Sequence, residues 1–240
     1  MDSDSKLCKL NILYVSRLDN KPFIDPANSI PAQVKAQSEI DNVFWLNLND
    51  RWGEYWAADS FKYAYGSQYK NIGLEGVEKI FTAPDVIIFE GFYEFPFSKL
   101  ADDAVRNKIP YVIIPRSQLT AQAQKQKALK KFLGNAAAVH YLTRQEQKDS
   151  SAWDVKSFII PNGMTPREYI HRDEPRNGIE AIYIGRINLF QKGLDLLVNA
   201  FARIKDEYEL MGKGAHLLAQ KYSWAEIAKL SHEIYQELVP

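Results

Sequence analysis

Cysteine is almost missing from this chain, which has one, Cys8, in 240 residues. A single cysteine forms no internal disulfide, and the shortage is typical of proteins in a reducing compartment. Long apolar runs are missing too, because no segment approaches the roughly 20 residues that a membrane-spanning helix needs. The polar start Met-Asp-Ser-Asp-Ser-Lys predicts no signal peptide. We expect a cytoplasmic protein, whose membrane contact, if any, is peripheral and on the inner face.

Neither sign of charge is in excess, because 30 basic residues balance 30 acidic residues. Proteins that bind nucleic acid usually carry a basic excess, so we expect no nucleic-acid partner. One segment, residues 116–148, departs from the balance with seven basic residues and one acidic. Four of its lysines lie on a helix predicted at residues 121–133: Lys125, Lys127, Lys130 and Lys131. This patch is either a solvated helix face or a contact for a phosphorylated acceptor or for anionic lipid, where each lysine contributes about 1 kcal/mol.

Short apolar runs recur along the first 160 residues and predict buried strands. They lie at residues 10–16, 43–48, 85–89, 111–114, 136–142 and 157–160. Helices are predicted between them at residues 32–40, 98–107 and 144–150, the last with Thr143 as its N-cap, while residues 51–69 receive no assignment. This alternation predicts an α/β fold with a Rossmann-like, mostly parallel sheet and helices on both faces. His140, within a strand, is expected to be a hydrogen-bonded core residue.

The pattern changes after Pro161-Asn162-Gly163. Residues 1–162 are predicted to form the first domain, followed by a polar linker at 163–179. One more strand is expected at 180–184 and an amphipathic helix at 193–205, and helices at about 211–221 and 225–238 end the chain. An apolar stripe on the last helix should pack on the first domain. Its members are Ile227, Leu230, Ile234 and Leu238.

Several of these stretches resemble the GT-B superfamily of retaining glycosyltransferases, in particular the group called family four. The acceptor-domain strand and loop of that family are similar to Ile-Pro-Tyr-Val-Ile-Ile-Pro-Arg-Ser-Gln-Leu at 109–119, although Ser117 replaces the usual glycine. Its interdomain segment is similar to Phe-Ile-Ile-Pro-Asn-Gly at 158–163. The most specific match is the opening of its donor domain, Tyr-Ile-Gly-Arg at 183–186 and Lys-Gly-Leu-Asp-Leu-Leu at 192–197. Tyr-Ser-Trp at 222–224 resembles the start of its closing helix, and the first 80 residues match in pattern only.

The resemblance implies that a sugar moves, with retention, from a nucleotide-sugar to a glycan or lipid-linked acceptor in polysaccharide biosynthesis. It implies no metal and no cofactor other than the nucleotide-sugar co-substrate. Arg186 and Lys192 match the pair that binds the donor diphosphate. Fixed cations near a helix N-terminus stabilise the charge that builds on a leaving diphosphate. The spacing alone favours a surface turn with two solvated cations, and the flanking Gly185 and Gly193-Leu194-Asp195 favour the diphosphate site.

Acceptor-side candidates follow the predicted strands, since parallel sheets bind ligands beyond the carboxyl ends of their strands. Arg116 matches a family position that faces the interdomain cleft. Residues 90–94 mix carboxylates with aromatic rings, a composition that suits either a sugar or a packed aromatic loop. The acceptor-binding candidates are Arg17, Glu90, Tyr93, Glu94 and Arg116.

Most of the donor domain that the resemblance calls for is missing from this sequence. The family has a pair of donor-site glutamates eight positions apart, whereas Glu226 and Glu233 are seven apart on the last helix. We expect residues 180–210 to be a remnant of the donor domain and residues 211–240 to pack back on the first domain. The truncated chain should be inactive alone, and a non-catalytic structural or regulatory subunit is the alternative. An unpaired strand at 180–184 would favour a homodimer.

Overall fold

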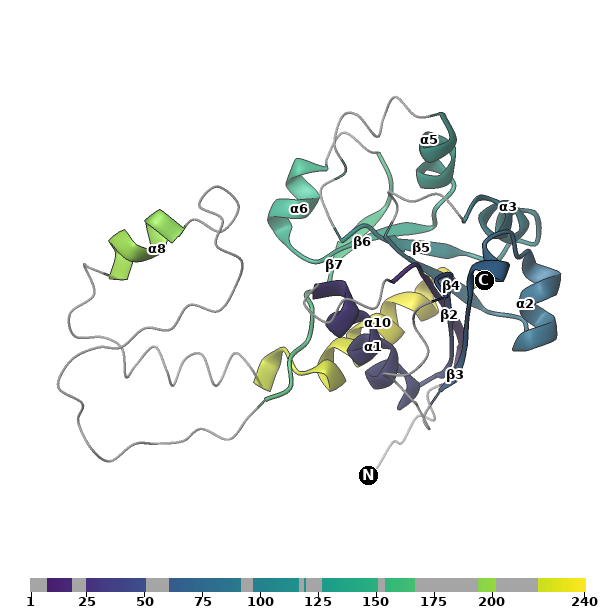
Figure 1. The fold of residues 1–240 in the computed structure, drawn as a ribbon, viewed down its shortest axis with the longest axis horizontal. Helices are drawn as coiled ribbons and strands as arrows, with labels where there is room; N and C mark the ends of the chain where they lie inside the picture. Colours follow the sequence, from purple (N-terminus) through teal and green to yellow (C-terminus); the bar gives the residue numbers. More distant parts are fainter. Residues whose placement is uncertain are drawn as a thin grey trace. The chain divides into compact units, whose positions relative to one another are not determined.

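The computed structural model describes residues 8–18, 25–50, 61–91, 97–116, 119, 127–150, 154–166, 194–201 and 220–240 (Figure 1). The chain divides into two compact units. Met1–Gly163 and Trp224–Pro240 form the first, and Met164–Ser223 form the second. The predicted strand at 180–184 lies outside the described residues, as do most of the helix predicted at 211–221 and the first part of the one predicted at 121–133.

One parallel sheet organises the described part of the first unit, with the strand order β3-β2-β1-β4-β5-β6-β7. The strands are β1 Asn11–Ser16, β2 Asn42–Asn47, β3 Lys62–Tyr65, β4 Val86–Glu90, β5 Tyr111–Ile114, β6 Ala138–Tyr141 and β7 Ser157–Ile159. Every pair of neighbours runs parallel. This confirms the predicted α/β class and its Rossmann-like parallel sheet.

Helices cover both faces of the sheet (Figure 1). Those of the first unit are α1 Asp25–Ser38, α2 Leu74–Ile80, α3 Ser98–Arg106, α5 Lys127–Gly134, α6 Arg144–Asp149 and α10 Trp224–Leu238, with a 3-10 turn η1 at Ser67–Tyr69. Buried residues of α1 and α10 pack on one face, and those of α2, α3 and α5 pack on the other. In the second unit, the described helix is α8 Leu194–Phe201.

The central strands are mostly apolar because both of their faces are covered. In β1, Ile12 and Tyr14 enter the core beneath α1 and α10, whereas Leu13 and Val15 enter the opposite core. Because successive side chains of a strand point to opposite faces, such a strand contributes side chains to both cores. The same two-sided burial explains why six of the strands are recognisable as continuous apolar runs.

Three elements differ from the sequence predictions. α1 begins at Asp25, not at residue 32, and contains Pro31. Pro26 lies in the first helical turn, where a missing N–H costs nothing, whereas Pro31 lies within the helix, where proline is unfavourable. β3 and α2 were not predicted, because a four-residue edge strand and a seven-residue helix carry little periodicity.

α10 packs against α1 and completes one face of the sheet. Its buried residues are Ile227, Ala228, Ser231, His232 and Tyr235. The predicted stripe is wrong at Leu230, which is 46% exposed. The helix turns a different face inward because two polar residues, Ser231 and His232, are buried with it.

A buried histidine–aspartate contact fixes α10 against the turn that follows α1. Nδ1 of His232 donates to both carboxylate oxygens of Asp41, at 2.7 and 2.8 Å. Asp41 also accepts hydrogen bonds from the Leu10 backbone N–H at 3.0 Å and from the Gln37 side chain at 2.6 Å. A buried carboxylate is costly to leave unpaired, so the contact between His232 and Asp41 favours one docking position of the helix.

We predict that truncating Tyr235, which is fully buried, destabilises the protein far more than truncating Leu230 on the same helix. Tyr235→Ala should lower the free energy of unfolding by about 3–5 kcal/mol, the usual cost of removing a buried aromatic ring. Leu230→Ala should change it by no more than about 0.5 kcal/mol. Urea denaturation of the two variants measures the difference. Equal losses would show that α10 does not present this face to α1.

Candidate functional site

The sheet reverses its strand order between β1 and β4, since β2 and β3 extend from one side of that pair and β5 to β7 from the other. In open α/β sheets, ligands bind beyond the carboxyl ends of the strands at such a point. Ser16 and Glu90 are the register partners there. Gly91 follows with φ +86, a conformation that favours glycine. The candidate site is therefore this carboxyl edge.

Arg116, two residues after β5, lies at the centre of the edge. Its Nε donates to Glu90 Oε2 at 2.8 Å, and the two side chains are 6% and 0% exposed. Nη1 donates to Ser29 Oγ at 2.8 Å and to Asn162 Oδ1 at 3.0 Å. Nη2 donates to Gln33 Oε1 at 2.8 Å. The guanidinium thus joins β4, the loop after β5, the helix α1 and the segment after β7.

These four partners account for the residue's unusual backbone. Arg116 has φ 59, in the left-handed region that costs a residue with a side chain about 1–3 kcal/mol. Hydrogen bonds from a guanidinium to a carboxylate are stronger than neutral ones and offset such a cost. In this arrangement the guanidinium connects the segments of the edge. All three of its nitrogens already donate to protein atoms.

Two tyrosines lie beneath the ion pair in the same core, Tyr14 of β1 and Tyr235 of α10. Burial raises the pKa of both phenols, and the nearby Glu90 carboxylate adds to the rise. Both therefore stay protonated. Tyr235 brings α10, the last helix of the chain, into the surroundings of the site.

His140 is a hydrogen-bonded core residue, as predicted. Its Nε2 donates to the Ile160 carbonyl at 2.7 Å. The pKa of His140 is lowered to about 4, chiefly by burial; the bond to Ile160 opposes this shift, and the charge of Arg116 adds to it. The ring is neutral at physiological pH and supplies no charge to the site.

A second polar set shapes the turn after β1. Asn47, the last residue of β2, accepts from the Leu18 backbone N–H at 2.8 Å and from Ser16 Oγ at 3.3 Å. Trp45 Nε1 donates to the same Ser16 hydroxyl at 2.8 Å. These contacts fix the backbone on either side of Arg17, whose exposed side chain lies at the carboxyl edge.

The structure brings together only part of the predicted site. Glu90 and Arg116 form its ion pair, and Arg17 lies on the same edge. The remaining candidates lie outside the described residues: Tyr93, Glu94, Arg186 and Lys192. Within the described ranges, no group of three or more His, Cys, Asp or Glu residues is arranged to hold a metal.

Sequence reasoning did not select Ser29, Gln33 or Asn162 as site residues. The signal in α1 is weak, because Ser29 and Gln33 are four residues apart and share a helix face with apolar neighbours. Asn162 stands in the Pro-Asn-Gly segment that was noted only as an interdomain motif.

Of the basic patch, Lys127, Lys130 and Lys131 are exposed on α5, whereas Lys125 lies outside the described residues. Lys131 Nζ pairs with Asp102 at 2.7 Å, which reduces the net charge of this surface. No helix in the described ranges is long and apolar enough to cross a bilayer.

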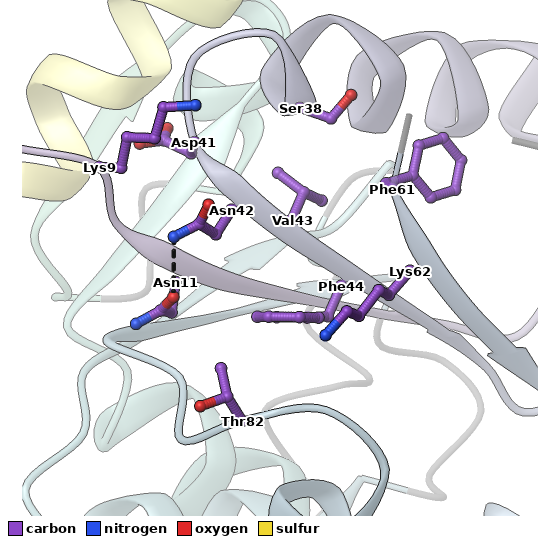
Figure 2. Close-up of a pocket in the computed structure, with 10 residues that line it drawn as sticks. All are labelled: Lys9, Asn11, Ser38, Asp41, Asn42, Val43, Phe44, Phe61, Lys62 and Thr82. Carbon is purple, nitrogen blue, oxygen red and sulfur yellow. Dashed lines mark hydrogen bonds between the residues drawn. The ribbon is translucent and has the colours of Figure 1, made fainter. Parts of the chain in front are cut away.

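A cavity of about 550 Å³ lies at the opposite edge of the sheet (Figure 2). Asn11, Asn42 and Lys62, the first residues of β1, β2 and β3, line it, and the Asn42 side chain donates to that of Asn11 at 3.2 Å. Lys62 Nζ lies 5.6 Å from the centre of the Phe44 ring. Because this is the amino edge, the cavity is separate from the switch-point site.

No family model matches the chain, and no curated protein sequence is significantly similar to it. Among solved structures, UDP-N-acetylglucosamine 2-epimerase from Rickettsia bellii is similar, with a TM-score of 0.42 and 13% sequence identity. The similarity covers 65% of this chain and 45% of the epimerase chain. The chain thus spans less than half the length of that protein. A likeness of this size carries no conclusion about activity.

We predict that the Arg116–Glu90 pair is needed as a pair. Arg116→Met should lower the free energy of unfolding by about 3–5 kcal/mol, because it leaves the Glu90 carboxylate buried without its cation. Adding Glu90→Leu removes that charge and should recover at least about 1 kcal/mol. Urea denaturation of both variants tests the coupling. Additive losses would show that the two charges are independent.

We also predict that His140 makes the fold sensitive to acid. The folded protein keeps His140 neutral down to about pH 4, whereas the unfolded chain binds a proton below about pH 6.5. Protons then favour the unfolded state, so stability falls by about 3 kcal/mol as the pH drops from 6.5 to 4. His140→Gln should lose this part of the pH dependence. Identical stability profiles of the variant and the wild type would contradict the assignment.

Proposed function

We propose that this chain is the acceptor-side part of a GT-B glycosyltransferase that transfers a sugar from a nucleotide-sugar to a glycan or lipid-linked acceptor, with retention. The observation that carries the proposal is the Glu90–Arg116 pair at the carboxyl edge of the sheet, at its switch point. Ligands of open α/β sheets bind at this place.

The meeting of two motifs supports the proposal. The resemblance concerns the loop after β5 and the Pro-Asn-Gly segment after β7, which are far apart in the sequence. Arg116 from the first lies 3.0 Å from Asn162 of the second, between Nη1 and Oδ1. Such a contact is expected if the acceptor loop and the interdomain segment form one site.

The role proposed for this edge is to bind and orient the acceptor. Holding an acceptor hydroxyl in position lowers the entropy cost of reaching the transition state, because that cost is met on binding. In favourable cases this lowers the activation free energy by several kcal/mol. A rigid edge serves this purpose, and the buried guanidinium provides rigidity. Arg17, exposed at the same edge, is proposed to contact the acceptor directly, together with Tyr93 and Glu94, which follow β4 in the sequence.

The donor side of the proposal rests on Arg186 and Lys192, which would stabilise the leaving diphosphate. The pair of donor glutamates has no counterpart in the sequence, so we propose that the chain alone is inactive. Its contribution would then be acceptor recognition, or a structural role beside a complete enzyme. Joining the chain to a complete donor domain separates the two: sugar transfer supports the enzyme reading, and its absence supports the non-catalytic subunit.

The proposed partners include an anionic membrane surface, through the lysines of α5. Lys127 and Lys130 are exposed and face no acidic partner in the described ranges, whereas Lys131 is paired with Asp102. A solvated helix face stays the alternative. A homodimer through residues 180–184 also stays a proposal, because that segment lies outside the described residues.

We predict that the chain binds nucleoside diphosphates only weakly, with dissociation constants of about 1 mM or more, since an incomplete site makes few contacts. Isothermal titration with UDP and GDP measures this affinity. Arg186→Ala should leave it nearly unchanged. Micromolar binding that disappears in Arg186→Ala would show that the donor site is complete, and the truncated reading would be wrong.

A further inference from the structure

We propose that Tyr65, at the end of the edge strand β3, binds one ring of a glycan acceptor. The proposal rests on the proposed function for its ligand class, and it adds a second contact point outside the Glu90–Arg116 edge. Three aromatic side chains carry it, Trp45 of β2 with Tyr63 and Tyr65 of β3.

These side chains form a stack that begins in the core and ends at the surface. The ring centroids of Trp45 and Tyr63 are 5.0 Å apart, and those of Tyr63 and Tyr65 are 5.7 Å apart with 21° between the planes. Both separations lie within the favourable range for aromatic pairs. Trp45 is fully buried, Tyr63 is half-buried, and Tyr65 is 42% exposed. The inner members therefore hold Tyr65 in place.

The exposed ring of Tyr65 suits a sugar. A pyranose has a face of C–H groups and a rim of hydroxyls, and an aromatic ring with a polar tip matches both parts. Polar side chains belong to the turn that follows Tyr65: Asp50 accepts from the Ser67 backbone N–H, and the Gln68 side chain donates to the Tyr65 carbonyl at 3.4 Å. Hydrogen bonding to Ser67 lowers the pKa of Asp50, so its exposed carboxylate is ionised.

Strand register places Tyr65 on the same edge as the candidate site. Tyr65 is the register partner of Asn47, and Asn47 is the partner of Ser16. Ser16 in turn is the partner of Glu90. Residues in register on parallel strands point to the same face, and three strand spacings of about 4.8 Å separate Tyr65 from Glu90, about 14 Å in all. Glu90 itself is buried, but an acceptor of several sugar rings is long enough to extend from Tyr65 along the surface of this edge towards Arg17, which is exposed there.

The test uses the full chain and soluble oligosaccharides of glucose and of N-acetylglucosamine, each as a disaccharide and as a hexasaccharide. Titration calorimetry measures their affinities. We expect a hexasaccharide to bind, and Tyr65→Ala to weaken it about tenfold, the loss of one aromatic contact of about 1.4 kcal/mol. Tyr65→Phe keeps the ring and should stay within about threefold of the wild type. Val105→Ala is the matched control, since Val105 is 44% exposed on α3.

The outcomes separate this proposal from the proposed function. A hexasaccharide that binds equally well to Tyr65→Ala overturns the Tyr65 contact and leaves the acceptor-side function standing. If no oligosaccharide binds the wild type, the Tyr65 contact is also overturned, and sugar transfer after joining a complete donor domain decides the function. Analytical ultracentrifugation tests whether a second copy of the chain binds at Tyr65. A dimer that Tyr65→Ala dissociates would show that a second copy of the chain, not a glycan, covers this ring.

Discussion

The carboxyl edge of the sheet depends on one buried cation. A guanidinium taken out of water is costly unless it is paired and fully hydrogen-bonded. Arg116 pairs four of its five N–H groups, with residues that are 26, 46, 83 and 87 positions away in the sequence. Two strands, a helix and the segment after β7 must all be in place before the charge is satisfied. The edge is therefore formed cooperatively. If one part of it moved, the Arg116 or Glu90 charge would lose a partner.

The closing helix extends this dependence to the other end of the chain. Tyr235 packs beneath the ion pair, and His232 is tied to Asp41 at the turn between α1 and β2. Residues 224–240 thus complete the covering of the sheet face on which α1 packs. Because these contacts combine ring packing with a buried polar pair, they define one docking position where an apolar stripe alone would tolerate several.

The parallel sheet was predictable because strands that are buried on both faces have nearly continuous apolar sequences. Glu90 and Arg116 were predictable for a related reason, as polar residues that directly follow such runs. Asn162 was not, because its role depends on a partner that only tertiary structure brings near. His232 misled the reading of the last helix, since a polar residue that is buried by pairing does not look like core. The start of α1 was not predictable, because Pro31 lies inside the helix and a proline is unfavourable there.

The first unit is divided in the sequence, and the second unit lies between its two parts. During synthesis at about 5–20 residues per second, the interval between the emergence of Gly163 and the end of α10 at Leu238 is about 4–15 s. For that time the sheet lacks its last covering helix, and of the described helices α1 alone packs on the aromatic and aliphatic side chains of β1 and β2 on that face. Nascent chains in this state are suitable clients for chaperones. The order of the segments therefore delays the completion of the first unit until residues 224–240 have been synthesised.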